Sequence, residues 1–119
     1  MNMEQRELKF RAWVDNNDGY AQMEYFTLYD RVRQYCGGYN VMQYTGFKYM
    51  DGKGKEIYHK DLIVNKSRNG GKPHLVEWSD KLGAWVGVYR GLEYFIAEEL
   101  HEIEVVGNFF ENPELVKHA

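Results

Sequence analysis

Short stretches of alternating apolar and polar residues recur along this chain of 119 residues, and turns rich in glycine, asparagine or aspartate separate them. Alternation with a period of two is typical of strands that bury one face, and these turn residues tolerate the positive φ angles of tight connections. Short strands joined by such turns at short intervals favour a small barrel or meander over repeated strand–helix–strand units. We therefore predict a mainly β fold.

The N-terminal part is predicted to form a β lobe. Residues 7–14 and 21–29 have the pattern of strands, and the Asn- and Asp-rich turn between them would join them as a hairpin. Residues 30–35 fit either one helical turn or the tail of a strand. A third strand is predicted at 39–44, ending at the Thr–Gly pair that follows. Trp13 lies on the opposite face of the first strand from its apolar residues, so it needs cover from another segment.

The C-terminal part continues as short strands and closes with a short helix. Asn112 has the pattern of an N-cap and Pro113 that of a first helical residue, which predicts the start of this helix. Strands are predicted at 61–64, 74–79, 84–89, 92–95 and 102–109, and one helical turn at 97–101.

Charge is unevenly distributed along the chain. Residues 48–72 carry seven Lys or Arg against three acids, whereas residues 92–115 carry seven acids and neither Lys nor Arg. The net charge of −3 argues against a strong, generic binder of polyanions. Opposed patches of this kind can pair within one fold or between copies of it, and they can also be two solvated faces.

The cysteine content and the apolar runs indicate the compartment. Cys36 is the only cysteine, so no disulfide can form within the chain and a reducing interior is expected. The N-terminus is polar and lacks the apolar region of a signal peptide. No apolar run approaches the roughly 18 residues that a membrane span needs. We expect a soluble, cytoplasmic protein.

No motif in the chain carries recognisable catalytic chemistry. His59 beside Asp61 is the closest approach to an acid–base pair, and Glu102 and Glu104 would share one face of a strand. No serine or cysteine has the flanking signature of a nucleophile. We predict no catalytic residues, no metal and no cofactor. The histidines, none at a ligand-pair spacing, are His59, His74, His101 and His118.

Several short motifs are similar, in their order along the chain, to those of the YopX family of phage and prophage proteins. Residues 20–40 match none of the family's motifs. The motifs are LKFRAW at 8–13, MQYTG at 42–46, DGKGKEIY at 51–58, DLI at 61–63, VEW at 76–78 and VVGNFFENPEL at 105–115.

The resemblance implies a mainly β protein whose C-terminal half is an SH3-like barrel that begins near Asp61, with a source in a phage or an integrated prophage. It implies no activity. On this basis we predict an N-terminal β lobe with a basic, turn-rich crossing at 1–60, followed by an SH3-like barrel at 61–119. The two parts are expected to form one compact unit.

A non-catalytic binding module is the function class that these features favour. Its partner would be a protein, either a host or phage factor or another copy in a homo-oligomer. The alternative is a nucleic-acid-binding module that uses the basic segment 48–72 and aromatic stacking. The aromatic residues proposed to line the protein-binding surface are Tyr44, Tyr58, Trp78 and Trp85. The bases proposed for the nucleic-acid alternative are Lys53, Lys55, Lys60, Lys66 and Arg68.

Overall fold

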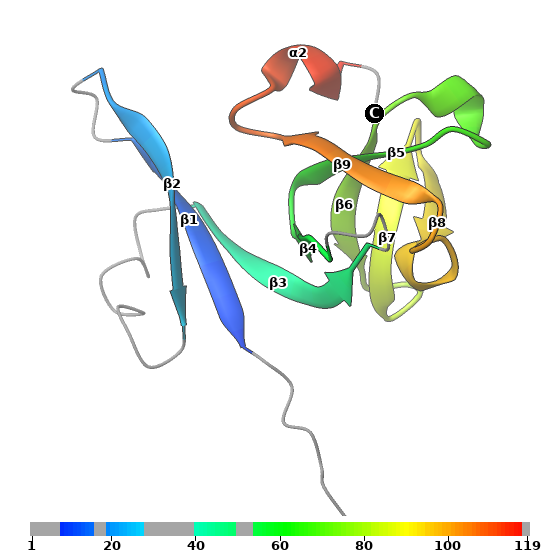
Figure 1. Ribbon diagram of the computed structural model, residues 1–119, viewed down its shortest axis with the longest axis horizontal. Helices are drawn as coiled ribbons and strands as arrows, with labels where there is room; N and C mark the ends of the chain where they lie inside the picture. Colours follow the sequence, from blue (N-terminus) through cyan, green and yellow to red (C-terminus); the bar gives the residue numbers. More distant parts are fainter. Residues whose placement is uncertain (1–7, 16–18, 28–39, 50–53, 118–119) are drawn as a thin grey trace, which may run out of the picture.

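The computed structural model describes residues 8–15, 19–27, 40–49 and 54–117, and within them the chain is mainly β, as predicted (Figure 1). Two antiparallel sheets account for the strands. The first sheet has the order β2-β1-β3-β4; β1 and β2 stand at one side of the molecule, and β3 runs from them toward β4, which lies beside the barrel. Its strands are β1 (Lys9–Asp15), β2 (Ala21–Thr27), β3 (Asn40–Lys48) and β4 (Glu56–Tyr58).

The predicted N-terminal hairpin is confirmed. β1 pairs with β2 in antiparallel register, and the paired Phe10 and Phe26 stack with ring centroids 5.6 Å apart. These two rings lie in a small apolar cluster with Ala12 and Val14, on the face of β1 that the alternation indicated. Trp13 lies on the opposite face, as predicted.

The third strand extends further than predicted. β3 continues through Thr45 and Gly46 to Lys48, so the expected end at the Thr–Gly pair is wrong. The physical reason is a register shift against β4 between Tyr44 and Lys48, which accommodates the φ of +88° at Gly46. The hydroxyl of Thr45 donates to the carbonyl of Ile57 at 2.7 Å and holds the two strands together there.

The second sheet curls into the SH3-like barrel that was predicted (Figure 1). Its order is β8-β7-β6-β5-β9, so four strands follow one another as a meander and the last returns beside the first. The expected helical turn near residue 97 is a 3₁₀ turn, η2 (Ile96–Glu98). The barrel strands are β5 (Asp61–Asn65), β6 (His74–Ser79), β7 (Ala84–Tyr89), β8 (Leu92–Phe95) and β9 (Ile103–Asn108), with a second 3₁₀ turn, η1 (Asn69–Gly71), between β5 and β6.

The short helix α2 (Pro113–Val116) begins where it was predicted, with Pro113 in its first turn. Asn112 occupies the N-cap position, but its side chain makes no capping bond to the helix. Its Oδ1 instead accepts a hydrogen bond from the backbone N–H of Asn108 at 3.0 Å. This backward bond brings Asn112 so close to Gly107 that a Cβ at residue 107 would lie 2.4 Å from Oδ1.

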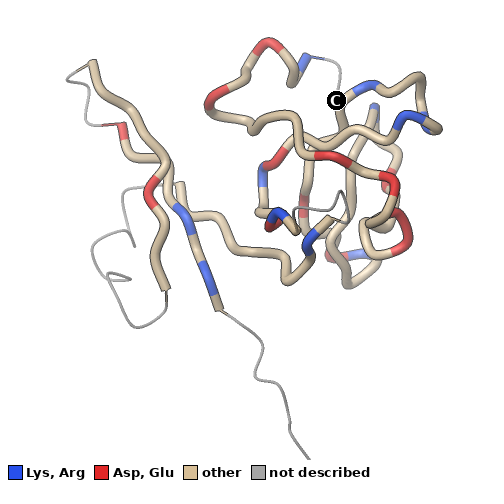
Figure 2. The backbone as a smooth tube through the Cα atoms, in the orientation of Figure 1, with Lys and Arg blue, Asp and Glu red and all other residues tan. Residues whose placement is uncertain are grey.

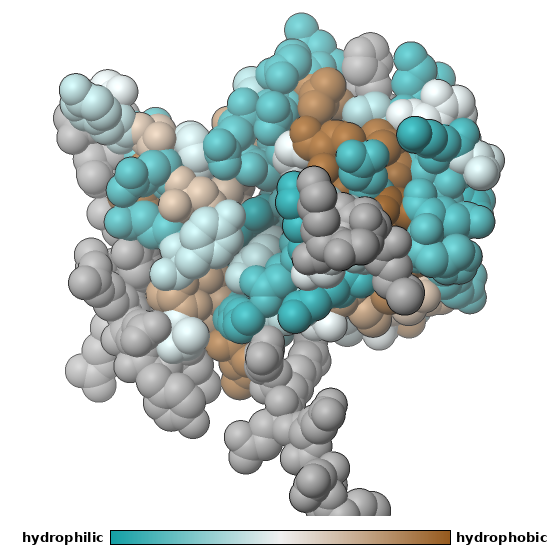
Figure 3. Space-filling model, viewed as in Figure 1, coloured by the Kyte–Doolittle hydropathy of each residue, from teal (hydrophilic) through white to brown (hydrophobic). Residues whose placement is uncertain are grey.

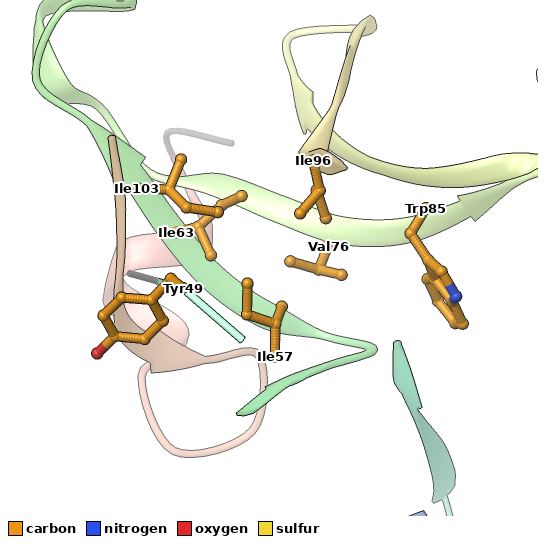
Figure 4. Close-up of a cluster of buried hydrophobic side chains, with 7 residues drawn as sticks. All are labelled: Tyr49, Ile57, Ile63, Val76, Trp85, Ile96 and Ile103. Atoms are coloured by element: carbon orange, nitrogen blue, oxygen red, sulfur yellow. The ribbon is translucent and has the colours of Figure 1, made fainter. Parts of the chain in front are cut away.

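The core of the barrel takes residues from both sheets (Figure 4). Tyr49, which follows β3, and Ile57 of β4 are 1% and 0% exposed and pack with barrel residues. The division at residue 60 stays a prediction, but the apolar packing runs across it. The cluster consists of Tyr49, Ile57, Ile63, Val76, Trp85, Ile96 and Ile103.

Trp13 receives the cover that its position requires. Its ring stacks on Phe110, in the loop between β9 and α2, with centroids 5.7 Å apart and an interplanar angle of 16°. Within the described residues, no helix has both the length and the apolar character to cross a bilayer. The sequence predictions that fall outside the described residues include those for residues 28–35, Cys36, Tyr39, Lys53 and His118.

Candidate functional site

A buried ion pair joins the two sheets. Nη2 of Arg11, in β1, donates to Oδ1 of Asp61 at 2.8 Å and to the carbonyl oxygen of His59 at 3.1 Å. Both charged side chains are 4% exposed. The other carboxylate oxygen of Asp61 accepts from the backbone N–H of Tyr58 at 2.8 Å. Burial raises the pKa of Asp61 above its usual range, while the positive charge of Arg11 acts in the opposite direction.

Tyr44 and Tyr58 form one half of the predicted aromatic surface, but the structure buries both. Their rings lie 5.4 Å apart between β3 and β4, and they are 4% and 5% exposed. The Tyr58 hydroxyl donates to Glu56 at 3.3 Å, and burial together with the Glu56 charge raises the pKa of Tyr58. Tyr25 of β2, at 62% exposure, meets Tyr58 edge-on. These two tyrosines therefore support the joint between the sheets rather than form an open surface.

An open pocket of about 330 Å³ lies at this joint. Figure 3 shows the outline of the molecule notched between the first sheet and the barrel. The pocket brings together residues from β1, β2, β4, β5 and β9, so both sheets are needed to form it. Its lining includes Arg11, Tyr25, Lys55, Glu56, Tyr58 and Asp61, together with three residues of β9.

Trp78 and Trp85 form the other half of the predicted aromatic surface. They face each other in the β6–β7 register, with ring centroids 5.5 Å apart in an edge-to-face arrangement. Trp85 is 8% exposed, whereas Trp78 is 48% exposed. The indole Nε1 of Trp78 donates to Asp80 at 3.0 Å, which fixes the orientation of the exposed ring. The four predicted residues thus form two pairs, and Trp78 is the member that is largely accessible.

The carboxylate of Glu77 contacts two polar side chains beside this tryptophan pair. His59 Nε2 lies 2.7 Å from one carboxylate oxygen of Glu77, and the ammonium of Lys60 bonds to the other. Burial is the largest single influence and opposes the ionisation of Glu77, but the hydrogen bonds from His59 and Lys60 and the charges of these two residues together outweigh it and lower the pKa of Glu77. The His59 ring also contacts Trp85, with centroids 5.6 Å apart. The acid–base pair suggested by the spacing of His59 and Asp61 does not form, because each side chain has a different partner.

The bases proposed for nucleic-acid binding differ in their surroundings: two are paired with carboxylates and two are exposed. Lys60 is paired with Glu77, and the Nε of Arg68 lies 2.6 Å from a carboxylate oxygen of Glu99. Lys55 and Lys66 are exposed. Figure 2 shows acidic residues, in red, along β9 and the turn before it. Part of the opposed charge is therefore neutralised within the fold.

His74 is enclosed by aromatic rings at another side of the barrel. It is 1% exposed, and its ring lies 5.2 Å from that of Tyr89 and 5.3 Å from that of Tyr94. Its Nε2 lies 3.2 Å from the amide nitrogen of Asn69. Burial lowers the pKa of His74. This environment suits a neutral, structural histidine.

The remaining candidate groups are dispersed. In the part of the chain that the structure describes, no three His, Cys, Asp or Glu side chains gather closely enough to hold a metal ion. Glu102 and Glu104 are both exposed, and Glu102 accepts a hydrogen bond from Asn65 at 3.2 Å.

Sequence reasoning missed Arg11, which occupies a polar position of an amphipathic strand and for which solvent exposure is the ordinary expectation. Its carboxylate partner left a detectable signal. Asp61 opens an otherwise apolar strand segment, and an acid in such a position needs a partner.

The fold and the site define a class of small β protein in which an SH3-like barrel and an N-terminal sheet share a buried ion pair and an aromatic joint. The chain belongs to the YopX family. The family model, described as YopX protein, matches residues 15–117. That match covers nearly the whole chain and begins just after the opening motif at 8–13.

A solved structure supports the same fold. The crystal structure of protein EF1440 from Enterococcus faecalis has a TM-score of 0.55 and 24% sequence identity to this chain, covering 92% of this chain and 97% of that one. At this identity the likeness concerns the fold alone. No curated protein gives a significant match.

Proposed function

We propose that this chain is a non-catalytic protein-binding module, encoded by a phage or prophage and acting in the cytoplasm of its bacterial host. The observation that carries the proposal is the exposed indole of Trp78, held at a fixed orientation on the barrel. The phage origin rests on the resemblance of the motifs, and the cytoplasmic location on the single cysteine.

Trp78 has the properties of an interface anchor. Tryptophan is enriched among the residues that dominate binding energy, because a large rigid ring buries much apolar area at small entropic cost. Here the ring packs edge-on against Trp85 and is tied to Asp80, so little ordering remains when a partner docks. A protein surface with an apolar recess is the matching partner.

The same observations make an enzymatic role and the nucleic-acid alternative less well supported. Glu77, with His59 and Lys60, forms a closed set of internal contacts beside Trp78. Lys60 and Arg68 already neutralise carboxylates, which lowers the charge available for phosphates. A second copy of the chain stays a candidate partner, because opposed charges at different sites can pair between copies.

The test is capture of partners from infected or prophage-bearing cells by the wild-type chain, by Trp78→Ser and by a matched control, Leu92→Ser. Leu92 is 55% exposed on β8, so both substitutions remove an exposed apolar side chain. We expect a nuclease-resistant protein to be captured by the wild type and Leu92→Ser and lost with Trp78→Ser. Capture of nuclease-sensitive material alone, or capture indifferent to Trp78, would contradict the proposal.

Light scattering on the purified chain separates self-association from binding to a foreign partner. A mass that is a multiple of 14.1 kDa for the wild type, reduced to the monomer by Trp78→Ser, identifies a second copy as the partner. A monomeric wild type directs the search to host and phage factors.

A further inference from the structure

We infer that the pocket between the two sheets is a second binding site, and that it accepts a peptide carboxylate. The pocket lies at the Arg11–Asp61 joint. Trp78 contacts Trp85 and Asp80, and neither of these residues lines the pocket. The inference concerns a different surface from the one that carries the proposed function, and it adds the chemical class of a ligand.

The acids of the pocket are already engaged. Asp61 accepts hydrogen bonds from Arg11 and from the backbone of Tyr58. Glu56 accepts from the ammonium of Lys9 at 2.6 Å and from the Tyr58 hydroxyl at 3.3 Å. Neither carboxylate therefore needs a cation from a ligand.

The basic residues of the pocket have a charge and a hydrogen-bond donor that no described residue pairs with. Lys55 is exposed and makes no ion pair with any described residue. In Arg11, the bonds to described residues come from Nη2, and the buried Nε has no partner among them. The pocket thus presents one uncompensated positive charge beside a guanidinium whose donors are only partly used, and a carboxylate forms its strongest hydrogen bonds with such donors.

Size and lining restrict the ligand further. A volume of about 330 Å³ is at the small end of ligand pockets, so it suits one side chain or a chain terminus rather than a folded segment. The rings of Tyr25 and Tyr58 and the side chain of Val105 supply apolar contact for the carbon atoms that carry the carboxylate. A phosphate dianion fits less well, because its second charge would lie near Glu56 and Asp61.

The test is an NMR titration of the ¹⁵N-labelled full chain with three short peptides. All three are N-acetylated: a Phe–Glu amide, a Phe–Gln amide, which is neutral, and Phe–Gln with a free carboxyl terminus. We expect saturable shifts of the Gly107 and Asn108 amides and of the Arg11 Nε–H with one or both peptides that carry a carboxylate. Comparison of those two peptides tells a side-chain carboxylate from a terminal one. The neutral amide should bind at least about fivefold more weakly, the factor that ~1 kcal/mol of charge pairing corresponds to.

Matched charge variants complete the design. Lys55→Glu should weaken binding of the carboxylate peptide about tenfold, whereas Lys66→Glu, with the same change in net charge at a residue outside the pocket lining, should change it less than about twofold. Equal effects of the two variants, equal binding of the neutral amide, or the absence of saturable shifts would overturn the inference. Trp78→Ser should bind the peptide like the wild type, so failure at this pocket and failure of the proposed function give different results.

Discussion

Arg11 of β1 and Asp61 of β5 form an ion pair of 2.8 Å across the joint between the two sheets, and each side chain is 4% exposed. Neither charged group has water to replace a lost partner. Removing one member of the pair therefore leaves an uncompensated buried charge, which destabilises the fold by more than the intact pair stabilises it. Arg11→Met should therefore lower the free energy of unfolding by about 3–5 kcal/mol, measured by urea denaturation.

The double variant Arg11→Met, Asp61→Leu provides the control for this prediction. It removes both charges and should recover most of the lost stability, because no uncompensated carboxylate remains buried. A double variant as unstable as Arg11→Met would show that the cost comes from packing against Tyr58 rather than from charge, since the guanidinium lies 4.8 Å from that ring.

Substitutions of the two tryptophans should have different effects on stability, because one residue belongs to the core and the other is proposed to bind a partner. Trp85 lies in the barrel core, so Trp85→Ala should cost about 3–5 kcal/mol in thermal or urea unfolding. Trp78→Ala should cost about 1 kcal/mol or less, because half of its surface is already in water. If Trp78→Ala unfolded the chain as Trp85→Ala does, Trp78 would be a core residue and a poor candidate for an interface.

His74 should make stability depend on pH below neutrality. Its folded pKa is lowered from 6.5 by burial, so the unfolded state binds more protons as the pH falls through about 6.5. Of the charged groups facing it, Glu99 opposes this lowering of the pKa and Arg68 adds to it. The free energy of unfolding should decrease by up to about 1.4 kcal/mol per pH unit below 6.5, down to the folded pKa.

The check on this pH dependence is urea unfolding of the wild type, His74→Gln and His101→Gln at several pH values from 7.5 to 5. The slope should be smaller in His74→Gln and unchanged in His101→Gln, because the His101 side chain is 69% exposed. A slope that survives in His74→Gln would assign the pH dependence to other groups.

Gly107 should not accept a side chain. An added Cβ would lie 2.4 Å from Oδ1 and 2.6 Å from Cγ of Asn112, and Asn112 is held there by its bond to the Asn108 backbone. Gly107→Ala should lower the free energy of unfolding by about 1–3 kcal/mol, measured by urea denaturation. Wild-type stability in this variant would mean that the loop at 108–112 can move away without cost.

The boundary at residue 60 can be tested by dissecting the chain. A fragment of residues 61–119 lacks Tyr49 and Ile57, which are almost fully buried in the barrel core. Each loss of this kind costs about 2–5 kcal/mol, a large part of the total stability of a small domain. The fragment should show no cooperative unfolding by circular dichroism, whereas the full chain should unfold in one transition. A cooperatively folded fragment would make the barrel an independent domain.

The sequence pattern predicted the strands well because a strand with one buried face leaves a period of two in the chain. β1, β6 and β7 lie where the alternation placed them. The end of β3 was predicted wrongly at Gly46, because a glycine in a register shift and a glycine that ends a strand look alike in the sequence.

The site was harder to predict, since its residues are brought together by pairing between distant segments. Tyr44 and Tyr58 were predicted to line a binding surface, but the structure buries both, because their burial depends on strand pairing that alternation alone does not specify. Arg11 has the appearance of a surface residue until β5 places Asp61 beside it. A charge that is buried by long-range contacts leaves almost no local pattern.

The stacking of Trp13 on Phe110 has a consequence for the order in which the chain becomes structured. The ribosome makes Phe110 long after Trp13, with most of the chain between them. Until Phe110 emerges, the indole on β1 lacks the ring that covers it, and the hairpin leaves an apolar surface open to chaperones or to neighbouring nascent chains. The loop that contains Phe110 therefore covers a strand that was synthesised much earlier. Slow translation of the segment before residue 110 would prolong the exposure of the Trp13 indole.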